Sequence, residues 1–357
     1  MFTHLSLMPL CLIFLAAAGA VWWAGIELSN MTDVLSERLG LGQALGGTVL
    51  LAIATNLPEI AITASAAWSG DLSVAVGNIL GGIAIQTVVL VVLDVFGTRG
   101  GPPLTYRAAS LSLVLEGTTV IGVLVVAVMA TQLPADLIAG RVTPGALLIA
   151  ALWIIGLGLV QRAGRGLPWH DDQGDAPGAQ EEAKGHSKRK KESGQVGGAK
   201  PSTARAITVF LGAAIVTLVA GVVLERSGDA AAGQVGLSGV LFGATVLAAA
   251  TSLPEVSTGL TSMRLGDYQL AVSDIFGGNA FLPVLFLLAT LVSGEAVLPS
   301  AHKSDIYLAA LGVLLTAVYI VGLIFRPRRR VLGMGLDSAA ALTLYLIGAA
   351  GLFAISS

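Results

Sequence analysis

Two short segments of the chain hold the side chains best suited to chemistry. They read Thr-Asn-Leu-Pro-Glu at 55–59 and Thr-Ser-Leu-Pro-Glu at 251–255, and each lies within a strongly apolar stretch. A carboxylate in a membrane span costs at least about 2.5 kcal/mol, so two such glutamates without a role are improbable. The threonine and the glutamate of each motif are four residues apart, which would place them on one face of an α-helix.

Each motif also contains a proline, which has no N–H and clashes with the carbonyl four residues earlier. Pro58 is therefore expected to release the carbonyl of Ala54, and Pro254 that of Ala250. Carboxylate, hydroxyl and carbonyl oxygens together suit a hard cation, above all Ca²⁺. The alternative is a pair of protonated or hydrogen-bonded glutamates that serve helix packing. The motif residues expected to act as ligands are Ala54, Thr55, Asn56, Glu59, Ala250, Thr251, Ser252 and Glu255.

A second polar cluster follows each motif along the chain. Positions 78, 82 and 86 would lie on one helix face, as would positions 274, 278 and 282. The Gly pairs at 81–82 and 277–278 favour close helix packing or local unwinding. Asp274 is either a third carboxylate of the site or a polar residue near a helix end. The candidate ligands of this cluster are Asn78, Gln86, Asp274 and Asn279.

The composition indicates an integral membrane protein. Of the 357 residues, 55% are hydrophobic and only 12% are charged, and the mean hydropathy is +0.83. A soluble domain carries about 25% charged residues. The net charge of −2 argues against a nucleic-acid partner, and the single cysteine, Cys11, excludes a disulfide within the chain and a cysteine-rich metal site. We expect membrane lipid and inorganic cations as partners and no cofactor; the sequence leaves the oligomeric state open.

Hydrophobicity predicts an all-α protein with ten transmembrane helices, since a span needs about 20 apolar residues. A polar segment at 163–204 is typical of a flexible linker and includes the run Lys188-Arg189-Lys190-Lys191. Glu116 lies in one apolar stretch, where it could relay protons, extend toward the membrane surface or pair with a neighbour. The expected spans are 5–28, 42–67, 72–96, 109–130, 144–162, 205–226, 238–263, 270–292, 304–325 and 334–355.

The distribution of basic residues predicts the orientation. With ten spans, the loops on one side and their flanks hold 17 of the 20 lysines and arginines. Loops rich in lysine and arginine face the cytoplasm. Both termini are therefore expected outside the cell membrane, for which a bacterial inner membrane is the simplest assumption, and the linker inside.

The chain repeats itself at an offset of 196 residues. From Gly40 to Ala84, 19 of 45 positions are identical to their partners, including the Pro-Glu motif and a Gly-Asp pair. Each half then holds five spans, and an odd number inverts the second copy, as in secondary transporters with a central site. The predicted units are a first repeat at 1–162 with its core motif at 40–96, a linker at 163–204, and a second repeat at 205–357 with its core motif at 236–292.

Thr-x-Leu-Pro-Glu, present once in each five-helix half and followed by a Gly-rich helix, resembles the Ca²⁺/cation antiporter superfamily, and most of all the prokaryotic sodium/calcium exchangers. This resemblance covers the whole chain. It implies that Thr55, Glu59, Thr251 and Glu255 coordinate Ca²⁺, with Asn56 and Ser252 at the position of the motif serine and carbonyl ligands from Ala54 and Ala250. It also implies that the first and sixth spans slide across the other eight.

The chain departs from this family pattern in the Gly-rich helices. Where the family has Gly-Ser-Asn-x-x-Asn or -Asp, the first copy reads Gly-Gly-Ile-Ala-Ile-Gln at 81–86 and the second reads Gly-Gly-Asn-Ala-Phe-Leu at 277–282. Serines that help to bind Na⁺ in the family are thus glycines, and the central Asn/Asp pair is Gln86 and Leu282. The resemblance thus implies a calcium site preserved in its core and depleted sodium sites, so protons are expected as an alternative counter-ion.

The function expected from these observations is secondary antiport of Ca²⁺, or of a related divalent cation, against Na⁺ or H⁺. Alternatives are a proton-coupled exchanger of another cation and a cation channel, although inverted repeats with broken helices favour alternating access over a pore. An intramembrane enzyme is disfavoured, because the spans hold no histidine near a serine at mid-membrane.

Overall fold

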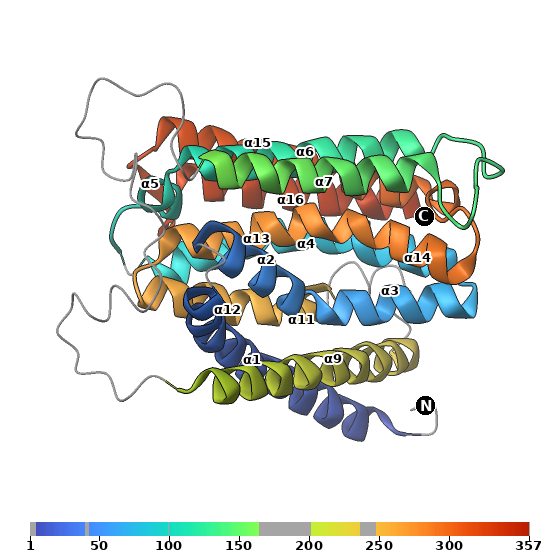
Figure 1. Cartoon of the computed structure of the whole chain (residues 1–357), viewed down its shortest axis with the longest axis horizontal. Helices are drawn as coiled ribbons and strands as arrows, with labels where there is room; N and C mark the ends of the chain where they lie inside the picture. The colour runs from blue at the N-terminus through green and yellow to red at the C-terminus, as the bar shows by residue number, and fades with distance from the viewer. Residues whose placement is uncertain (1–4, 40–42, 99, 164–200, 236–247, 357) are drawn as a thin grey trace.

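The computed structural model describes residues 5–39, 43–98, 100–163, 201–235 and 248–356, which are almost entirely helical (Figure 1). The elements of the first half are α1 (Leu7–Leu39), α2 (Gln43–Thr55), α3 (Leu57–Ser69), α4 (Leu72–Gly97), α5 (Leu104–Ala108), α6 (Leu111–Ala130) and α7 (Pro144–Ala163). The elements of the second half are α9 (Thr203–Gln234), α11 (Ala248–Thr251), α12 (Leu253–Arg264), α13 (Tyr268–Phe281), η2 (Leu282–Val284), α14 (Leu285–Ser293), η3 (Leu298–Ser300), α15 (Lys303–Phe325), β1 (Arg330–Val331), β2 (Met334–Gly335) and α16 (Leu336–Ser356).

Seven helical segments in the described part of the chain are long and apolar enough to cross a membrane. They correspond to the first, third, fourth, fifth, sixth, eighth and ninth expected spans. The bent pair Val49–Thr55 and Leu57–Ser69 would make an eighth. The seventh expected span begins outside the described residues, and the tenth corresponds to the shorter apolar stretch Leu336–Leu352. Most of the expected linker, residues 164–200, also lies outside them.

The expected ends of two spans are wrong. The helix that begins near residue 5 continues to Leu39 rather than 28, and the one that begins near 205 continues to Gln234 rather than 226. Apolar content limits only the part of a helix that suits lipid, whereas polar residues such as Asn30 and Arg38 continue the same backbone hydrogen bonding beyond residue 28.

Each Pro-Glu motif breaks its helix. In the first copy, α2 ends at Thr55, Asn56 has φ −87° and ψ 16°, and α3 begins at Leu57 with a bend of 57°. In the second copy, Ser252 separates α11 from α12 with φ −83° and ψ 3°. The expectation that Thr55 and Glu59 share one face of a single helix is therefore wrong. The proline lacks the N–H that would continue the first helix, so the two residues come from two helix segments that meet at the break.

The helices form a large bundle against which α1 and α9 lie together (Figure 1). The main apolar core lies inside this bundle and includes α4, α6, α13 and α15. Contacts exchange between the halves: α1 packs against α12 and α9 against α3, while α4 packs against α15 and α13 against α6. Helices of the first half therefore pack against helices of the second half throughout the bundle.

Two glycines mark where α1 and α9 cross the motif helices. A Cβ on Gly221 of α9 would lie 2.6 Å from the Cβ of Pro58, and a Cβ on Gly25 of α1 would lie 3.2 Å from the carbonyl oxygen of Pro254. Their numbers differ by 196, the offset of the sequence repeat. Small residues let helices in membranes approach closely, so the same crossing is built twice.

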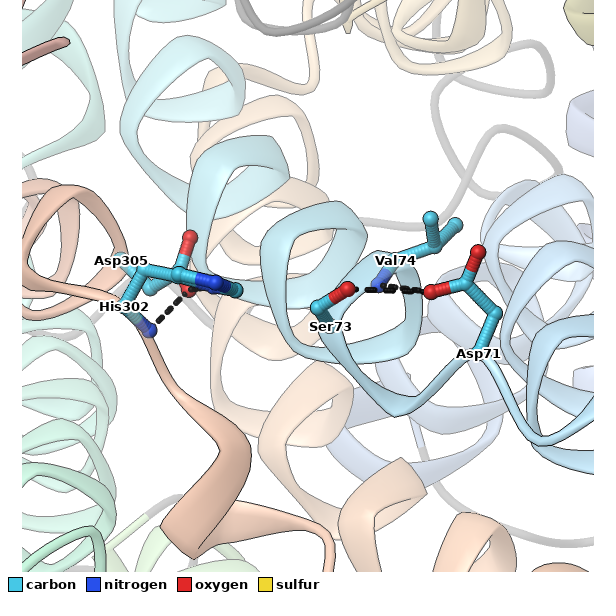
Figure 2. Close-up of polar contacts among 5 residues, drawn as sticks. All are labelled: Asp71, Ser73, Val74, His302 and Asp305. Atoms are coloured by element: carbon cyan, nitrogen blue, oxygen red, sulfur yellow. Dashed lines mark hydrogen bonds and ion pairs between the residues drawn. The ribbon is translucent and has the colours of Figure 1, made fainter.

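Carboxylates cap the helices that follow the motifs. Asp71 accepts hydrogen bonds from the Ser73 hydroxyl at 3.0 Å and from the Val74 amide at 3.4 Å, at the start of α4 (Figure 2). Asp267, its partner in the repeat, accepts one from the Leu270 amide at 3.0 Å at the start of α13. Each cap satisfies a backbone donor that a helix N-terminus leaves unpaired.

Near Asp71, Asp305 caps α15 by accepting a hydrogen bond from the His302 amide at 2.7 Å (Figure 2). A Cβ on Gly77 would lie 3.6 Å from this carboxylate, so the first turns of α4 and α15 meet at one end of the bundle. The start of α13 is at the other end, because Tyr268 contacts Arg107 beside Asp267, and Arg107 belongs to α5. The two copies of the motif-plus-helix unit therefore point in opposite directions.

Candidate cation site

Both motif glutamates are buried where the broken helices meet. Glu59 and Glu255 are each 1% exposed, although each belongs to the first turn of a helix that begins inside the bundle. The motif residues beside them are also buried. Negative charge is favourable at the N-terminal end of a helix because the backbone N–H groups there point outward. The break thus provides each carboxylate with a favourable position that an unbroken helix would not offer.

The two motifs face each other across the halves of the chain. Thr251 of the second motif and Gln86 of α4 lie beside the carboxylate of Glu59. Thr55 of the first motif lies beside the carboxylate of Glu255. The charges of Glu59 and Asp274 both act on Glu255. The structure therefore brings together the two threonines and two glutamates that the sequence identifies.

The buried side-chain oxygens in this region are unusually short of hydrogen-bond donors. Buried polar groups in proteins are nearly always paired. Oxygens that face no donor in hydrogen-bond geometry instead offer lone pairs to a cation. They are Oε1 and Oε2 of Glu59, Oε2 of Glu255, Oε1 of Gln86, Oδ1 of Asp274 and Oδ1 of Asn279.

Asn56, one of the expected ligands, is held by two hydrogen bonds. Its Nδ2 donates to the Ala52 carbonyl at 2.7 Å, and its Oδ1 accepts from Gln86 Nε2 at 3.0 Å. The same Gln86 nitrogen lies 3.5 Å from Glu255 Oε1. Both ends of the Asn56 amide are therefore engaged, and Asn56 orients Gln86, whose own side-chain oxygen has no donor.

The second cluster is only partly assembled around the glutamates. Asn78 donates to the Glu59 carbonyl at 3.4 Å and to the Thr63 hydroxyl at 3.3 Å, so it ties α4 to α3 through the backbone of Glu59 and not through its carboxylate. Asn279 donates to the Thr87 hydroxyl at 3.0 Å. Asp274 accepts a hydrogen bond from the Thr258 hydroxyl at 2.5 Å.

Asp274 is 1% exposed and thus lies in the interior, not at a wet helix end. This position favours the first of the two interpretations of Asp274, a carboxylate that belongs to the central cluster. Its second oxygen has no donor, and its charge acts on Glu255.

At positions 82, 278 and 282, where the chain departs from the family pattern, the surroundings are apolar or are occupied by a neighbouring side chain. A Cβ on Gly278 would lie 2.7 Å from Asn56 Nδ2, so the longer Asn56 side chain occupies the space beside this glycine. Leu282 is fully buried, and its Cδ1 is the nearest atom to a Cβ on Gly82, at 4.0 Å. The structure therefore places no hydroxyl at 82 or 278 and a hydrocarbon at 282.

Several residues of this network are absent from the sequence-based prediction. Thr258 and Thr87 orient Asp274 and Asn279, and Ser273 donates to Glu116 at 2.7 Å. Thr258 corresponds to Ile62 in the repeat, so comparing the two halves of the sequence does not identify Thr258 as a functional residue. The hydrogen bond of Glu116 supports pairing with a neighbour, one of the three roles considered for this glutamate.

The carboxylates alone do not make a metal centre. Within the described ranges, no group of three or more histidine, cysteine, aspartate or glutamate side chains is arranged to hold a metal ion. A cation between the motifs would therefore be held by the two glutamates together with neutral oxygens. Such a mixed oxygen set suits a transported ion, which must bind and then leave.

A helical bundle with membrane-length apolar helices, broken twice beside a pair of buried carboxylates, is typical of secondary transporters. Comparison with known proteins gives the family. The chain matches the sodium/calcium exchanger protein family over residues 9–160 and 205–354, and it belongs to this family.

Similar proteins support this assignment. The CaxA protein of Alkalimonas amylolytica, which is named an antiporter, is 26% identical over 305 residues, covering 83% of this chain and 86% of CaxA. The inner membrane protein YrbG of Escherichia coli strain K12 is 31% identical over 99 residues, covering 27% of this chain and 30% of YrbG. A structure of the sodium-calcium exchanger NCX_Mj aligns with a TM-score of 0.64 and 16% identity, covering 97% of this chain and all of NCX_Mj, and it shares the fold.

Proposed function

We propose that this protein is a secondary antiporter that moves Ca²⁺, or a related divalent cation, across a cell membrane in exchange for Na⁺ or H⁺. The observation that carries this proposal is the group of buried oxygens without donors around Glu59 and Glu255. Ca²⁺ prefers six to eight oxygen ligands of mixed type. Two glutamate charges match one divalent cation.

The same two charges explain why the ion would be exchanged and not simply released. Two buried carboxylates without a compensating charge are costly, because the interior solvates charge poorly. When Ca²⁺ leaves, the site needs another cation or protons before it can be enclosed by protein again. One pair of glutamates therefore serves both transported species in turn, with the carbonyls of Ala54 and Ala250 and the hydroxyls of Thr55, Thr251 and Ser252 as further ligands.

The packing supports ten spans in two inverted halves. The contacts exchange between the halves, and Asp71 and Asp267 cap equivalent helices that point in opposite directions. An inverted pair can alternate between inward-facing and outward-facing states by exchanging the conformations of its halves. The helices α1 and α9 would slide across the rest, guided by the paired glycine crossings.

The arrangement also supports the orientation drawn from basic residues. Segments assigned to one side meet in the structure: Arg107 contacts Tyr268, and Arg326 lies over the ring of Tyr106 at 4.7 Å. On the other side, Arg141 donates to the Leu291 carbonyl at 3.1 Å. If this basic side faces the cytoplasm, both termini lie outside, and a bacterial inner membrane is the simplest location.

The local structure favours protons over Na⁺ as the counter-ion. The positions of the family's sodium-binding serines carry no hydroxyl, one of them is packed against Asn56, and position 282 is a leucine. The two carboxylates remain, and carboxylates accept protons.

Transport by purified protein in liposomes tests the proposal. We expect uptake of radioactive Ca²⁺ driven by an imposed pH gradient, with a smaller response to a Na⁺ gradient. Glu59→Gln and Glu255→Gln should each abolish uptake. Glu116→Gln is the matched control, because it removes another buried carboxylate while its amide can keep the hydrogen bond from Ser273.

Each other result has a distinct meaning. Uptake driven mainly by Na⁺ would overturn the preference for protons but retain the antiporter. Ca²⁺ leakage that needs no counter-ion would indicate a channel. Absence of uptake by folded protein under either gradient would reject Ca²⁺ as the substrate.

A further inference from the structure

A second group of buried oxygens without donors lies away from the central site. It occurs where the end of α4, the short helix α5 and the start of α16 meet, at the end of the bundle that carries α5 (Figure 1). Both carboxylate oxygens of Asp337 and the hydroxyl oxygen of Thr105 are buried there and have no partner in hydrogen-bond geometry. Thr105, which is 1% exposed, lies beside the Asp337 carboxylate.

Asp94 places a second carboxylate at the same point. It is fully buried, and its two oxygens accept hydrogen bonds from the Leu104 amide at 2.8 Å and the Gly335 amide at 2.6 Å. These bonds hold α5 and β2 against the end of α4. Each carboxylate oxygen has two lone pairs, so each can still bind a cation.

Glycines leave room between the two acids. A Cβ on Gly335 would lie 2.5 Å from Asp337 Oδ1 and 3.1 Å from Asp94 Oδ2, so one oxygen of each acid borders the same small space. A Cβ on Gly322 of α15 would collide with the Asp337 carboxylate. The charges of Asp337 and Asp94 both act on the Tyr319 hydroxyl, which lies 3.4 Å from that of Ser338.

The charge of this pair has no protein partner. Within the described ranges, neither Asp94 nor Asp337 forms an ion pair with a lysine or an arginine. The charged group that acts on Asp337 is Asp94 itself, which repels it. Asp337 also belongs to the first turn of α16, where a carboxylate is favourable, and the backbone amides of Asp337 and Ser338 lie beside its carboxylate.

We propose that Asp94, Asp337 and Thr105 form a second cation site, which binds a hard divalent cation, Ca²⁺ or Mg²⁺, at the cytoplasmic end of the bundle. Two carboxylates balance its charge, and the ligands are all oxygens, as such ions prefer. The site joins α4, α5, β2 and α16, so a bound ion would hold these elements together. It shares no residue with the central site and does not depend on the proposed transport function.

The test measures binding of radioactive Ca²⁺ to the full-length purified protein at equilibrium. A Glu59→Gln/Glu255→Gln background removes the proposed central ligands and isolates the second site. We expect about one Ca²⁺ per chain to remain bound in this background and unlabelled Mg²⁺ to compete for it. Adding Asp337→Asn should weaken the remaining binding at least tenfold.

Two further variants separate ligation from structure. Gly322→Ala should weaken the remaining binding as well, since it fills the space at Asp337 while alanine suits the interior of α15. Asp305→Asn is the matched control, because it changes another first-turn carboxylate that already has a backbone partner, and it should leave binding intact. Thermal unfolding of each variant establishes that it is folded.

The proposal is overturned if the Glu59→Gln/Glu255→Gln protein binds neither Ca²⁺ nor Mg²⁺, in which case Asp94 and Asp337 share a proton. It is equally overturned if Asp337→Asn leaves the binding unchanged. A different result is expected if the central site does not bind Ca²⁺. The wild type and the Glu59→Gln/Glu255→Gln protein would then bind the same number of Ca²⁺ ions per chain.

Discussion

At the scale of single residues, Asn56 and Gly278 behave as a compensating pair. Asn56 is larger than the serine of the family motif, and Gly278 is smaller than the serine of the family helix. In the structure the Asn56 amide lies against Gly278 and binds Gln86, so one substitution fills the space that the other opens. This pairing changes which oxygens face the glutamates without leaving a cavity.

The pairing predicts strong coupling between the two positions. Gly278→Ser alone should destabilise the protein by about 1–3 kcal/mol, because overpacking a filled core costs that much. Asn56→Ser alone should also destabilise it, since the bonds to Ala52 and Gln86 are lost. The double variant should be more stable than the sum of the single effects by about 0.5–3 kcal/mol. Unfolding of the four proteins in detergent measures the coupling.

Simple additivity of the two substitutions would contradict the compensation. The double variant also restores two serines of the family pattern. If the depleted hydroxyls are what limits Na⁺ binding, its Ca²⁺ uptake should respond more strongly to a Na⁺ gradient than that of the wild type.

At the scale of elements, the proposed movement of α1 and α9 depends on how these two helices pass over the broken helices. A Cβ on Gly221 would meet Pro58, and one on Gly25 would meet the Ser257 hydroxyl and then Pro254, so each crossing lies against the motif helix of the opposite half. A side chain at either glycine would press on the segment that carries a motif glutamate. The crossings therefore connect the movement of α1 and α9 to the geometry of the site.

We predict that Gly25→Ala and Gly221→Ala slow Ca²⁺ exchange by tenfold or more while the protein remains folded. Gly19→Ala in α1 and Gly212→Ala in α9 are matched controls, because nothing lies within 4 Å of a Cβ at either position. Alanine is favoured over glycine in a helix by about 1 kcal/mol, so the controls should be as stable as the wild type or more so. Equal rates in all four variants would show that the crossings do not limit transport.

At the scale of the whole molecule, cation binding joins segments that are distant in sequence. The central oxygens come from α3, α4, α12 and α13, which belong to both halves. A ligand that binds only the folded protein stabilises it by mass action, by about 2.7 kcal/mol at one hundred times its dissociation constant.

Ca²⁺ should therefore raise the thermal unfolding temperature of the wild type. The increase should be smaller in Glu59→Gln/Glu255→Gln and should disappear when Asp337→Asn is added, since both proposed sites are then lost. Thermal unfolding in detergent with and without Ca²⁺ measures this, with K⁺ at matched ionic strength as the control. An increase of the same size in all three proteins would indicate that Ca²⁺ binds elsewhere.

The orientation of the whole chain is testable with cysteine labelling. In a Cys11→Ser background, Asp136→Cys lies in an exposed loop on the proposed outer side, and Arg329→Cys lies in an exposed loop on the inner side. A maleimide that cannot cross membranes should label Asp136→Cys in intact cells and Arg329→Cys only after permeabilisation. The reverse pattern would place both termini in the cytoplasm.

Much of this protein follows from local sequence. Long apolar stretches lead to membrane helices because backbone groups in lipid must be paired within their own segment. The repeated Thr-x-Leu-Pro-Glu motif indicates both the site and the helix breaks, since proline acts on its own backbone and glutamate is rare in apolar segments. The family match is consistent with this interpretation of the motif.

Tertiary structure decides the partners of each side chain. Whether Asn56 is a ligand depends on Gln86 and Gly278, which approach it from other helices. Asp94 and Asp337 are 243 positions apart in the chain, and neither lies in the matched stretch at 40–84 or in its copy at 236–280, so no local pattern indicates that they meet. Sequence alone therefore determines which segments enter the membrane and where their helices break, because these depend on interactions within one segment. The composition of both proposed cation sites depends on packing between segments, which only the folded chain defines.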